Sequence, residues 1–304
     1  MAGRIFYWVF NMSLTASLMG CLVLLLRMIK AIPRRIFIFL WLVPFVRMCV
    51  PIGLGNPYSL MSLLTRFTGK TVEVWKPAEG PGMYITNMVQ AAESYSPVVY
   101  KVWIYETLFN VGAFVWIVGA LAVLIVLAVL YRSTIKEMRD AVPLKENVYL
   151  SEKIEGPAVY GIFRPRIVLP ASFAGRDLRY ILAHEETHIR RGDNLWRLLG
   201  FFAAAVHWFN PLSWVFLKAF LADLELACDE KAVAALNEPE RREYAAMLLD
   251  CAESRNVFVS AFGGAKIRTR IENVLSFKRM TGAAVICLSA FTAAIIVTLI
   301  TNAG

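Results

Sequence analysis

Four long apolar runs divide the chain, and polar segments separate them. The runs cover about residues 5–29, 36–54, 109–131 and 283–300. Each approaches or exceeds the roughly 20 residues that a helix needs to cross the hydrocarbon core of a bilayer. We therefore predict four transmembrane helices.

Basic residues set the expected orientation of these helices. The loop after the first run contains Arg27, Lys30, Arg34 and Arg35, and such loops face the cytoplasm. The N-terminus is then outside the cell. A cleaved signal peptide is the alternative, but its positive charge would precede the apolar run instead of following it.

The same rule divides the chain into three parts. Residues 1–131 form a membrane region with three spans and an extracellular loop at 55–108. Residues 132–282 hold 22 of the 32 Lys and Arg and form a cytosolic domain. Residues 283–304 form the fourth span and a short extracellular end. The predicted class is a mainly α membrane protein with an α+β domain inserted between the third and fourth spans.

Shorter patterns organise the cytosolic domain. Three strands are expected at 147–151, 158–161 and 165–169, because apolar stretches alternate there with Gly and Pro turns. They form a small sheet whose edge either receives an extended peptide or only covers the domain. A helix is expected from near Asp177 to Arg191, with Gly192 as its C-terminal cap.

Two further helices follow, at 194–209 and 211–236. Asn210 and Pro211 separate them as a cap and a first-turn proline. Each apolar half is too short to span a bilayer, so we predict a cytosolic pair packed on each other and against the membrane bundle.

Composition agrees with the membrane class. The chain is 58% hydrophobic with a mean hydropathy of +0.55, which is more apolar than ordinary soluble domains. We interpret its net charge of +9 as a signal of membrane topology and as complementary to anionic lipid headgroups. We expect no direct contact with nucleic acid. The five cysteines show no paired spacing, so no disulfide framework is expected.

One motif within the cytosolic domain carries candidate chemistry. His184, Glu185 and His188 form an HExxH pattern. Residues four apart share a helix face, so both imidazoles can bind one metal ion, with Glu185 beside it as the general base. Two imidazoles with an open position suit a single Zn²⁺ ion, and the reaction would be peptide hydrolysis without a covalent intermediate.

A catalytic zinc needs a third protein ligand. Glu225 is the main candidate, and His207 and Cys228 are the alternatives. Asp229 lies four residues after Glu225 on the same helix face, where it can accept the other N–H of a ligand histidine. His207 is also a candidate donor to the oxyanion of the transition state, although a packed histidine beside Trp208 is the simpler interpretation.

With these residues the chain resembles the membrane zinc peptidases of the BlaR and MecR antirepressor family, which are gluzincin-like signal transducers of β-lactam resistance. The segments that carry this resemblance are His184–Asp193, His207–Pro211, Glu225–Glu230 and Gly161–Pro170. The resemblance spans the whole chain, four helices included. It implies His184, His188 and Glu225 as zinc ligands and Glu185 as general base.

The resemblance also implies partners. A cytosolic repressor would be the substrate, and self-cleavage would occur in the basic linker 266–279, with the bond between Ser276 and Phe277 as the candidate site. The alternative for this linker is an anchor on the membrane surface. Family members carry an extracellular penicillin-binding sensor with an S-x-x-K motif after the last span, and no such motif follows the last predicted span in this sequence. We expect either a sensor outside this sequence or a different trigger, and a homodimer is a further candidate.

Two competing functions remain open at this point. One is a housekeeping membrane metalloprotease of the HtpX or CAAX-processing type, which shares HExxH and a later glutamate. The other is a non-hydrolytic transducer with a structural metal site. Glu185 argues against the second, because a structural site needs no base.

Overall fold

The computed structural model describes residues 2–29, 32–50, 55–56, 58–59, 84–85, 98–99, 103–252, 265–279 and 281–301. The predicted extracellular loop 55–108 lies almost wholly outside these residues. Within it the structure describes a short antiparallel pair, β1 (Tyr84–Ile85) and β2 (Val98–Val99).

Three helices of the described chain are long and apolar enough to cross a membrane. They are α1 (Ala2–Arg27), α5 (Trp103–Glu137) and α12 (Gly282–Ile300), which correspond to the first, third and fourth predicted spans. The second candidate, α2 (Arg34–Cys49), has 16 residues and is roughly 24 Å long. Its length falls short of a full span, so the count of four transmembrane helices remains a prediction.

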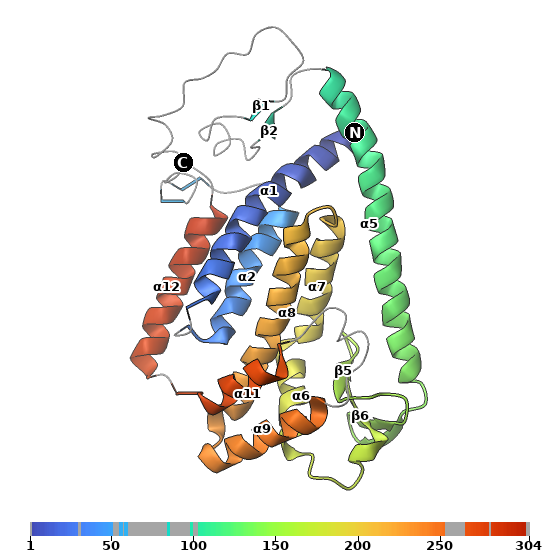
Figure 1. The fold of residues 1–304 in the computed structure, drawn as a ribbon, viewed down its shortest axis with the longest axis vertical. Helices are drawn as coiled ribbons and strands as arrows, with labels where there is room; N and C mark the ends of the chain where they lie inside the picture. Colours follow the sequence, from blue (N-terminus) through green and yellow to red (C-terminus); the bar gives the residue numbers. More distant parts are fainter. Residues whose placement is uncertain are drawn as a thin grey trace.

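The elements of the predicted domain extend into the helical bundle instead of forming a separate body. The hairpin of α7 (Asp193–Val206) and α8 (Pro211–Ala232) stands beside α1 and α2, as Figure 1 shows. Phe216, Phe220 and Phe201 share one buried core with Trp41 and Val23. The expected packing against the membrane bundle is confirmed, and the hairpin is part of the bundle core.

The turn of this hairpin also contacts α5. Trp208 donates from Nε1 to the carbonyl of Trp116, and Trp116 donates to the carbonyl of Val206. Gly119 has no side chain, which allows the Trp208 ring to lie directly against the α5 backbone. The short side chain of Asn210 caps α8 as predicted, by accepting from the amide of Leu212.

A small sheet lies at the opposite end of the hairpin. Its order is β3 (Val142–Lys145), β4 (Val148–Ser151), β6 (Arg166–Pro170) and β5 (Ala158–Tyr160). Only β4 and β6 are parallel. The last three of these strands were predicted, and β3 was not. The 3-10 turn η1 (Ala171–Phe173) leads from β6 towards α6 (Arg179–Arg191), which packs on the sheet through Ile181, Ile167 and Leu169.

Two helices in the second half of the domain were not predicted. They are α9 (Glu238–Ala252) and α11 (Ile267–Leu275), and a 3-10 turn, η2 (Val233–Ala235), links α8 to α9. Val233, Tyr244, Leu248 and Val274 form a buried cluster with Tyr180 of α6. Helix α11 lies in the segment 266–279, so much of that linker is a packed helix. The start of α1 and the end of α12 lie at the end of the bundle away from α6, as Figure 1 shows.

Candidate metal centre

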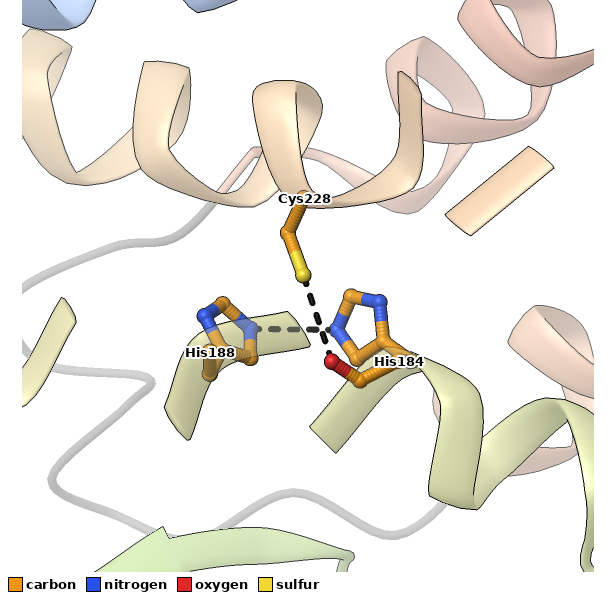
Figure 2. A group of neighbouring side chains, drawn as sticks. All are labelled: His184, His188 and Cys228. Atoms are coloured by element: carbon orange, nitrogen blue, oxygen red, sulfur yellow. Dashed lines mark hydrogen bonds between the residues drawn. The ribbon is translucent and has the colours of Figure 1, made fainter. Parts of the chain in front are cut away.

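The two motif histidines project from one face of α6. Their rings are buried, with exposed fractions of 6% for His184 and 4% for His188. Their Nε2 atoms are 3.2 Å apart. Two imidazoles on a tetrahedral zinc would place these atoms roughly 3.3 Å apart. The backbone of α6 therefore sets the histidines at the spacing that one ion requires. Figure 2 shows the two rings with Cys228 beside them.

The other nitrogen of each ring is held by a polar partner. His184 Nδ1 lies 2.8 Å from the Tyr244 hydroxyl and 3.3 Å from Asp229 Oδ1. His188 Nδ1 lies 2.6 Å from Asp193 Oδ2. Such partners fix the ring orientation and leave Nε2 as the metal-binding atom. Gly192, with φ of 65°, turns the chain directly after α6, and α7 begins at Asp193. This turn brings the Asp193 carboxylate to His188.

Helix α8 brings two further donors to the histidines. The Glu225 oxygens lie 3.7 Å from His184 Nε2 and 3.8 Å from His188 Nε2. The Cys228 sulfur and one ring nitrogen of each histidine all lie within 4.8 Å of one another. Cys228 also donates to the carbonyl of His184, at 3.3 Å. Two of the three candidates for the third ligand, Glu225 and Cys228, are therefore at the site, one helical turn apart, and His207 is not.

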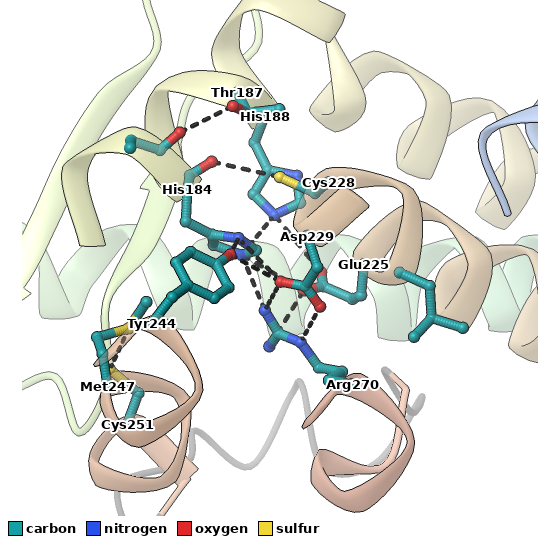
Figure 3. A network of polar contacts seen from close by, with 12 residues as sticks. His184, Thr187, His188, Glu225, Cys228, Asp229, Tyr244, Met247, Cys251 and Arg270 are labelled. Atoms are coloured by element: carbon teal, nitrogen blue, oxygen red, sulfur yellow. Dashed lines mark hydrogen bonds and ion pairs between the residues drawn. The ribbon is translucent and has the colours of Figure 1, made fainter. Parts of the chain in front are cut away.

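Asp229 is buried behind His184 in a network that Figure 3 shows. The Tyr244 hydroxyl donates to Asp229 Oδ1 at 2.8 Å. Arg270 of α11 donates to both Asp229 oxygens at 2.7 Å. The expectation that Asp229 supports a motif histidine agrees with this geometry.

Burial and charge shift the pKa values of this cluster in opposite directions. Burial raises the pKa of Asp229, but Arg270 and His184 lower it more and bring it to about 2. For Glu225 burial is likewise opposed by His188, His184 and Arg270, which hold its pKa well below the usual range. Burial lowers the pKa of His188, yet Cys228 and Glu225 raise it to about 9. The site is thus a buried cluster that pairs carboxylates with cations.

Glu185, the candidate general base, is buried beside the first motif histidine. It follows His184 on α6, and its side chain is 7% exposed. Its carboxylate forms no hydrogen bond with any other residue that the structure describes. Its carboxylate is therefore not committed to another partner, as a general base requires.

His207 lies elsewhere and cannot donate to a reaction at this centre. It is fully buried, and its Nε2 atom is 3.0 Å from the carbonyl of Met48, near the C-terminal end of α2. Glu230, next to Asp229, contacts the amides of Arg34 and Arg35 at the other end of α2. The two places are roughly 20 Å apart along α2. These contacts agree with the interpretation of His207 as a packed residue and not with a role as an oxyanion donor.

The candidate cleavage bond lies just after α11. Ser276 donates to the carbonyl of Glu272, and the carbonyl of Phe277 accepts from Arg241 at 2.8 Å. The guanidinium of Arg241 also lies over the Phe277 ring. This bond is part of folded structure in the state described.

The sequence did not single out Tyr244, Arg270 or Arg197. Arg197 of α7 contacts Glu225 Oε1 at 2.6 Å. Tyr244 and Arg270 are 60 and 86 residues from His184, and no short motif contains them. At the outer strand β5, Asn194 donates to the carbonyls of Val159 and Gly161, so these two acceptors of the sheet edge already have a partner.

The donor set fits a single zinc ion. Two buried imidazoles held from behind, with a partly buried carboxylate or a buried thiolate, are the groups that zinc prefers. Oxygen-rich sites for Mg²⁺ or Ca²⁺ have a different composition.

Comparison with known proteins agrees with this centre. Residues 7–274 match the family model Peptidase_M56, described as the BlaR1 peptidase. The chain is 28% identical over 116 residues to the "Regulatory protein BlaR1" of Bacillus licheniformis, covering 36% of the chain and 19% of that protein. It is 29% identical over 105 residues to the "Methicillin resistance mecR1 protein" of Staphylococcus aureus (strain Mu50 / ATCC 700699), covering 33% and 18%.

These alignments thus span less than a fifth of each relative's length. The family model, by contrast, covers most of the chain, including α6, α8 and Arg270. The chain therefore belongs to the BlaR1 peptidase M56 family.

Proposed function

We propose that the chain is an integral-membrane zinc endopeptidase of signal transduction. The observation that carries this proposal is the pair of buried Nε2 atoms 3.2 Å apart on α6, with the Glu225 carboxylate facing both. His184, His188 and Glu225 would hold the ion. When bound, zinc would polarise the scissile carbonyl and promote attack by water.

The chain's own residues do the remaining work. Glu185 accepts a proton from the attacking water and passes it to the leaving amine. Asp229 and Tyr244 orient His184, and Asp193 orients His188. The site is buried among α6, α8, α9 and α11. We therefore expect that only an extended segment of a substrate can reach it.

The relatives suggest what such a peptidase does. Their names describe a regulatory protein and a methicillin resistance protein. We extend this to a bacterial plasma-membrane protein that cleaves a cytosolic repressor after an extracellular signal such as a β-lactam. The N-terminus would be outside and α6 would face the cytoplasm, in keeping with the basic loop after α1.

The experiment compares native protein with Glu185→Gln in bacterial membranes. Both should bind one zinc ion, because Glu185 is not a ligand. New protein termini should appear only with the native chain, and the rate should fall at least about 10²-fold in the variant, the usual loss of a general base. Zinc content by elemental analysis and termini by mass spectrometry give the two readouts. Equal sets of termini with zinc still bound would contradict the proposal and favour a structural metal site.

Self-cleavage between Ser276 and Phe277 belongs to the same proposal. The bond directly follows α11, whose Arg270 already contacts the cluster. Cleavage there requires the end of α11 to leave Arg241, because an extended strand is what peptidases bind. N-terminal sequencing should find a fragment that starts at Phe277 with the native chain and none with Glu185→Gln. A fragment that starts elsewhere would contradict this choice of bond.

A further inference from the structure

Arg270 brings a positive charge from α11 into the metal cluster. Its side chain is 12% exposed, which is unusual for a residue on a short surface helix. Its Nε and Nη2 atoms lie 2.7 Å from the two oxygens of Asp229, as Figure 3 shows. This two-point bond fixes the plane of the carboxylate as well as its position.

The same guanidinium reaches two other members of the cluster. Its Nη1 atom is 3.5 Å from Glu225 Oε2, and its Nη2 atom is 3.2 Å from His184 Nε2. One side chain therefore contacts the candidate ligand carboxylate and the partner of a ligand histidine, while its contact with His184 Nε2 must give way once a metal takes that lone pair. Without it, the carboxylates of Asp229 and Glu225 would share the cluster with one cation fewer, which is costly in a low-dielectric site.

Helix α11 is held in place by contacts of its own. Val274 packs in the cluster with Tyr244 and Leu248, and Asn273 donates to the carbonyl of Leu226 on α8. Arg270 therefore reaches the cluster from a docked helix. Its neighbour Arg268 differs, because it is 88% exposed and pairs with Glu272 on the same helix.

We propose that Arg270 is a positioning residue of the zinc site. This inference rests on one part of the proposed function, namely that zinc is the resident metal. The two-point bond of Arg270 holds Asp229 against His184, and its charge keeps Glu225 turned towards the imidazoles. The zinc site is then complete only while α11 is docked. Because α12 begins at Gly282, soon after α11 ends, the state of this span bears on zinc binding.

The test measures zinc affinity in the purified full chain, by competition with a chromophoric chelator. Arg270→Ala should weaken binding about 10–100-fold, the usual effect of losing a partner of a metal ligand. Arg270→Lys should not restore it, because an ammonium cannot make the two-point bond. The matched control, Arg268→Ala, should bind zinc as the native chain does. Native-like affinity in Arg270→Ala or in Arg270→Lys would overturn the proposal.

A double variant separates positioning from loss of structure. If Arg270 acts through Asp229, then Asp229→Asn with Arg270→Ala should lose little more affinity than Arg270→Ala alone. Fully additive losses would contradict the proposal. Arg270→Lys keeps charge and bulk, so it serves as the folded variant if Arg270→Ala does not fold. Glu185→Gln should lose proteolysis and keep native zinc affinity, so failure of the enzyme proposal leaves the zinc result readable.

Discussion

At the scale of single residues, Glu225 and Cys228 offer two different atoms for the third position around the metal. Glu225 is turned towards both histidines but is also paired with Arg197 and Arg270. Cys228 is fully buried, and His184 and His188 lower its pKa, against the effect of burial, to about 7. The carboxylate faces both Nε2 atoms, so we expect it to bind.

Cobalt substitution distinguishes these two ligands, because a thiolate bound to Co²⁺ gives an intense near-ultraviolet charge-transfer band and a carboxylate does not. We expect the Co²⁺ protein to lack this band and Cys228→Ser to leave the spectrum unchanged. Glu225→Gln should lower metal affinity by at least about 10–100-fold, because the loss of a ligand costs no less than the loss of a residue that only orients a ligand. A band that disappears in Cys228→Ser would instead assign the third position to sulfur.

Tyr244 is a second residue whose effect can be measured separately. Its hydroxyl lies between His184 Nδ1 and Asp229 Oδ1, at 2.8 Å from each. Tyr244→Phe keeps the ring in the core and removes that bridge. We expect about 1–3 kcal/mol lower stability, because the buried polar groups lose a partner. Thermal unfolding checks this value, and an unchanged melting temperature would show that water replaces the hydroxyl.

At the scale of elements, α8 joins the membrane bundle to the metal centre. Its first half contributes Phe216 and Phe220 to the bundle core, and its last turns contribute Glu225 and Asp229 to the site. The hairpin that α8 forms with α7 is kept in place by close approaches to α1 and α5. Gly20 lies against Phe216, and Gly119 lies against Trp208.

A methyl group at Gly119 would lie 2.3 Å from the Trp208 ring, so the ring or the helix must move. We expect Gly119→Ala to lower the stability of the full chain in detergent by about 1–3 kcal/mol, the usual cost of overpacking. Gly282→Ala is the control, because nothing lies within 4 Å of the added carbon. Unfolding followed by circular dichroism compares the two. Equal stability of the Gly119→Ala and Gly282→Ala proteins would mean that α5 can move away from the α7–α8 hairpin without loss of free energy of unfolding.

Sequence patterns predicted the elements whose signals are local. The helix of the motif, the left-handed Gly192 after it and the Asn210 cap of α8 follow from a few adjacent residues. The role of Arg270 does not, because its partners lie on α6 and α8 and only the folded chain brings α11 to them. The pattern of α11 was hidden in a basic segment that also suits a membrane anchor. His207 is the opposite case. A histidine is a suitable ligand or donor by residue type, but the fold places this one at the other end of α2.

At the scale of the whole molecule, the bundle and the peptidase elements share one hydrophobic core. Residues of α1, α2, α7 and α8 are buried against one another. The expected cytosolic domain 132–282 is therefore not closed on itself. Leu195, Leu198, Leu199 and Phe202 on α7 remain 47–50% exposed, as suits a helix that contacts lipid or another apolar surface.

This shared core predicts the behaviour of a fragment. Residues 132–282 expressed alone should not form a soluble, zinc-binding monomer, because Phe216, Leu217 and Phe220 would be uncovered. Fractionation and size-exclusion chromatography, with and without detergent, would test this. The full chain in the same detergent is the control. A soluble, monomeric fragment that binds zinc would show that the domain folds without α1 and α2.

Two adjacent carboxylates on α8 face different parts of the molecule. Asp229 points to the metal cluster, and Glu230 accepts from the first amides of α2 at 2.9 and 3.3 Å. Glu230 is 8% exposed, so pulling α2 away would strand a charged group without its partners. A tilt of α2 must therefore either carry the last turn of α8 with it or leave Glu230 unpaired. A displacement of the N-terminal end of α2 would therefore be transmitted to α8 through Glu230, one residue from Asp229 of the candidate metal centre.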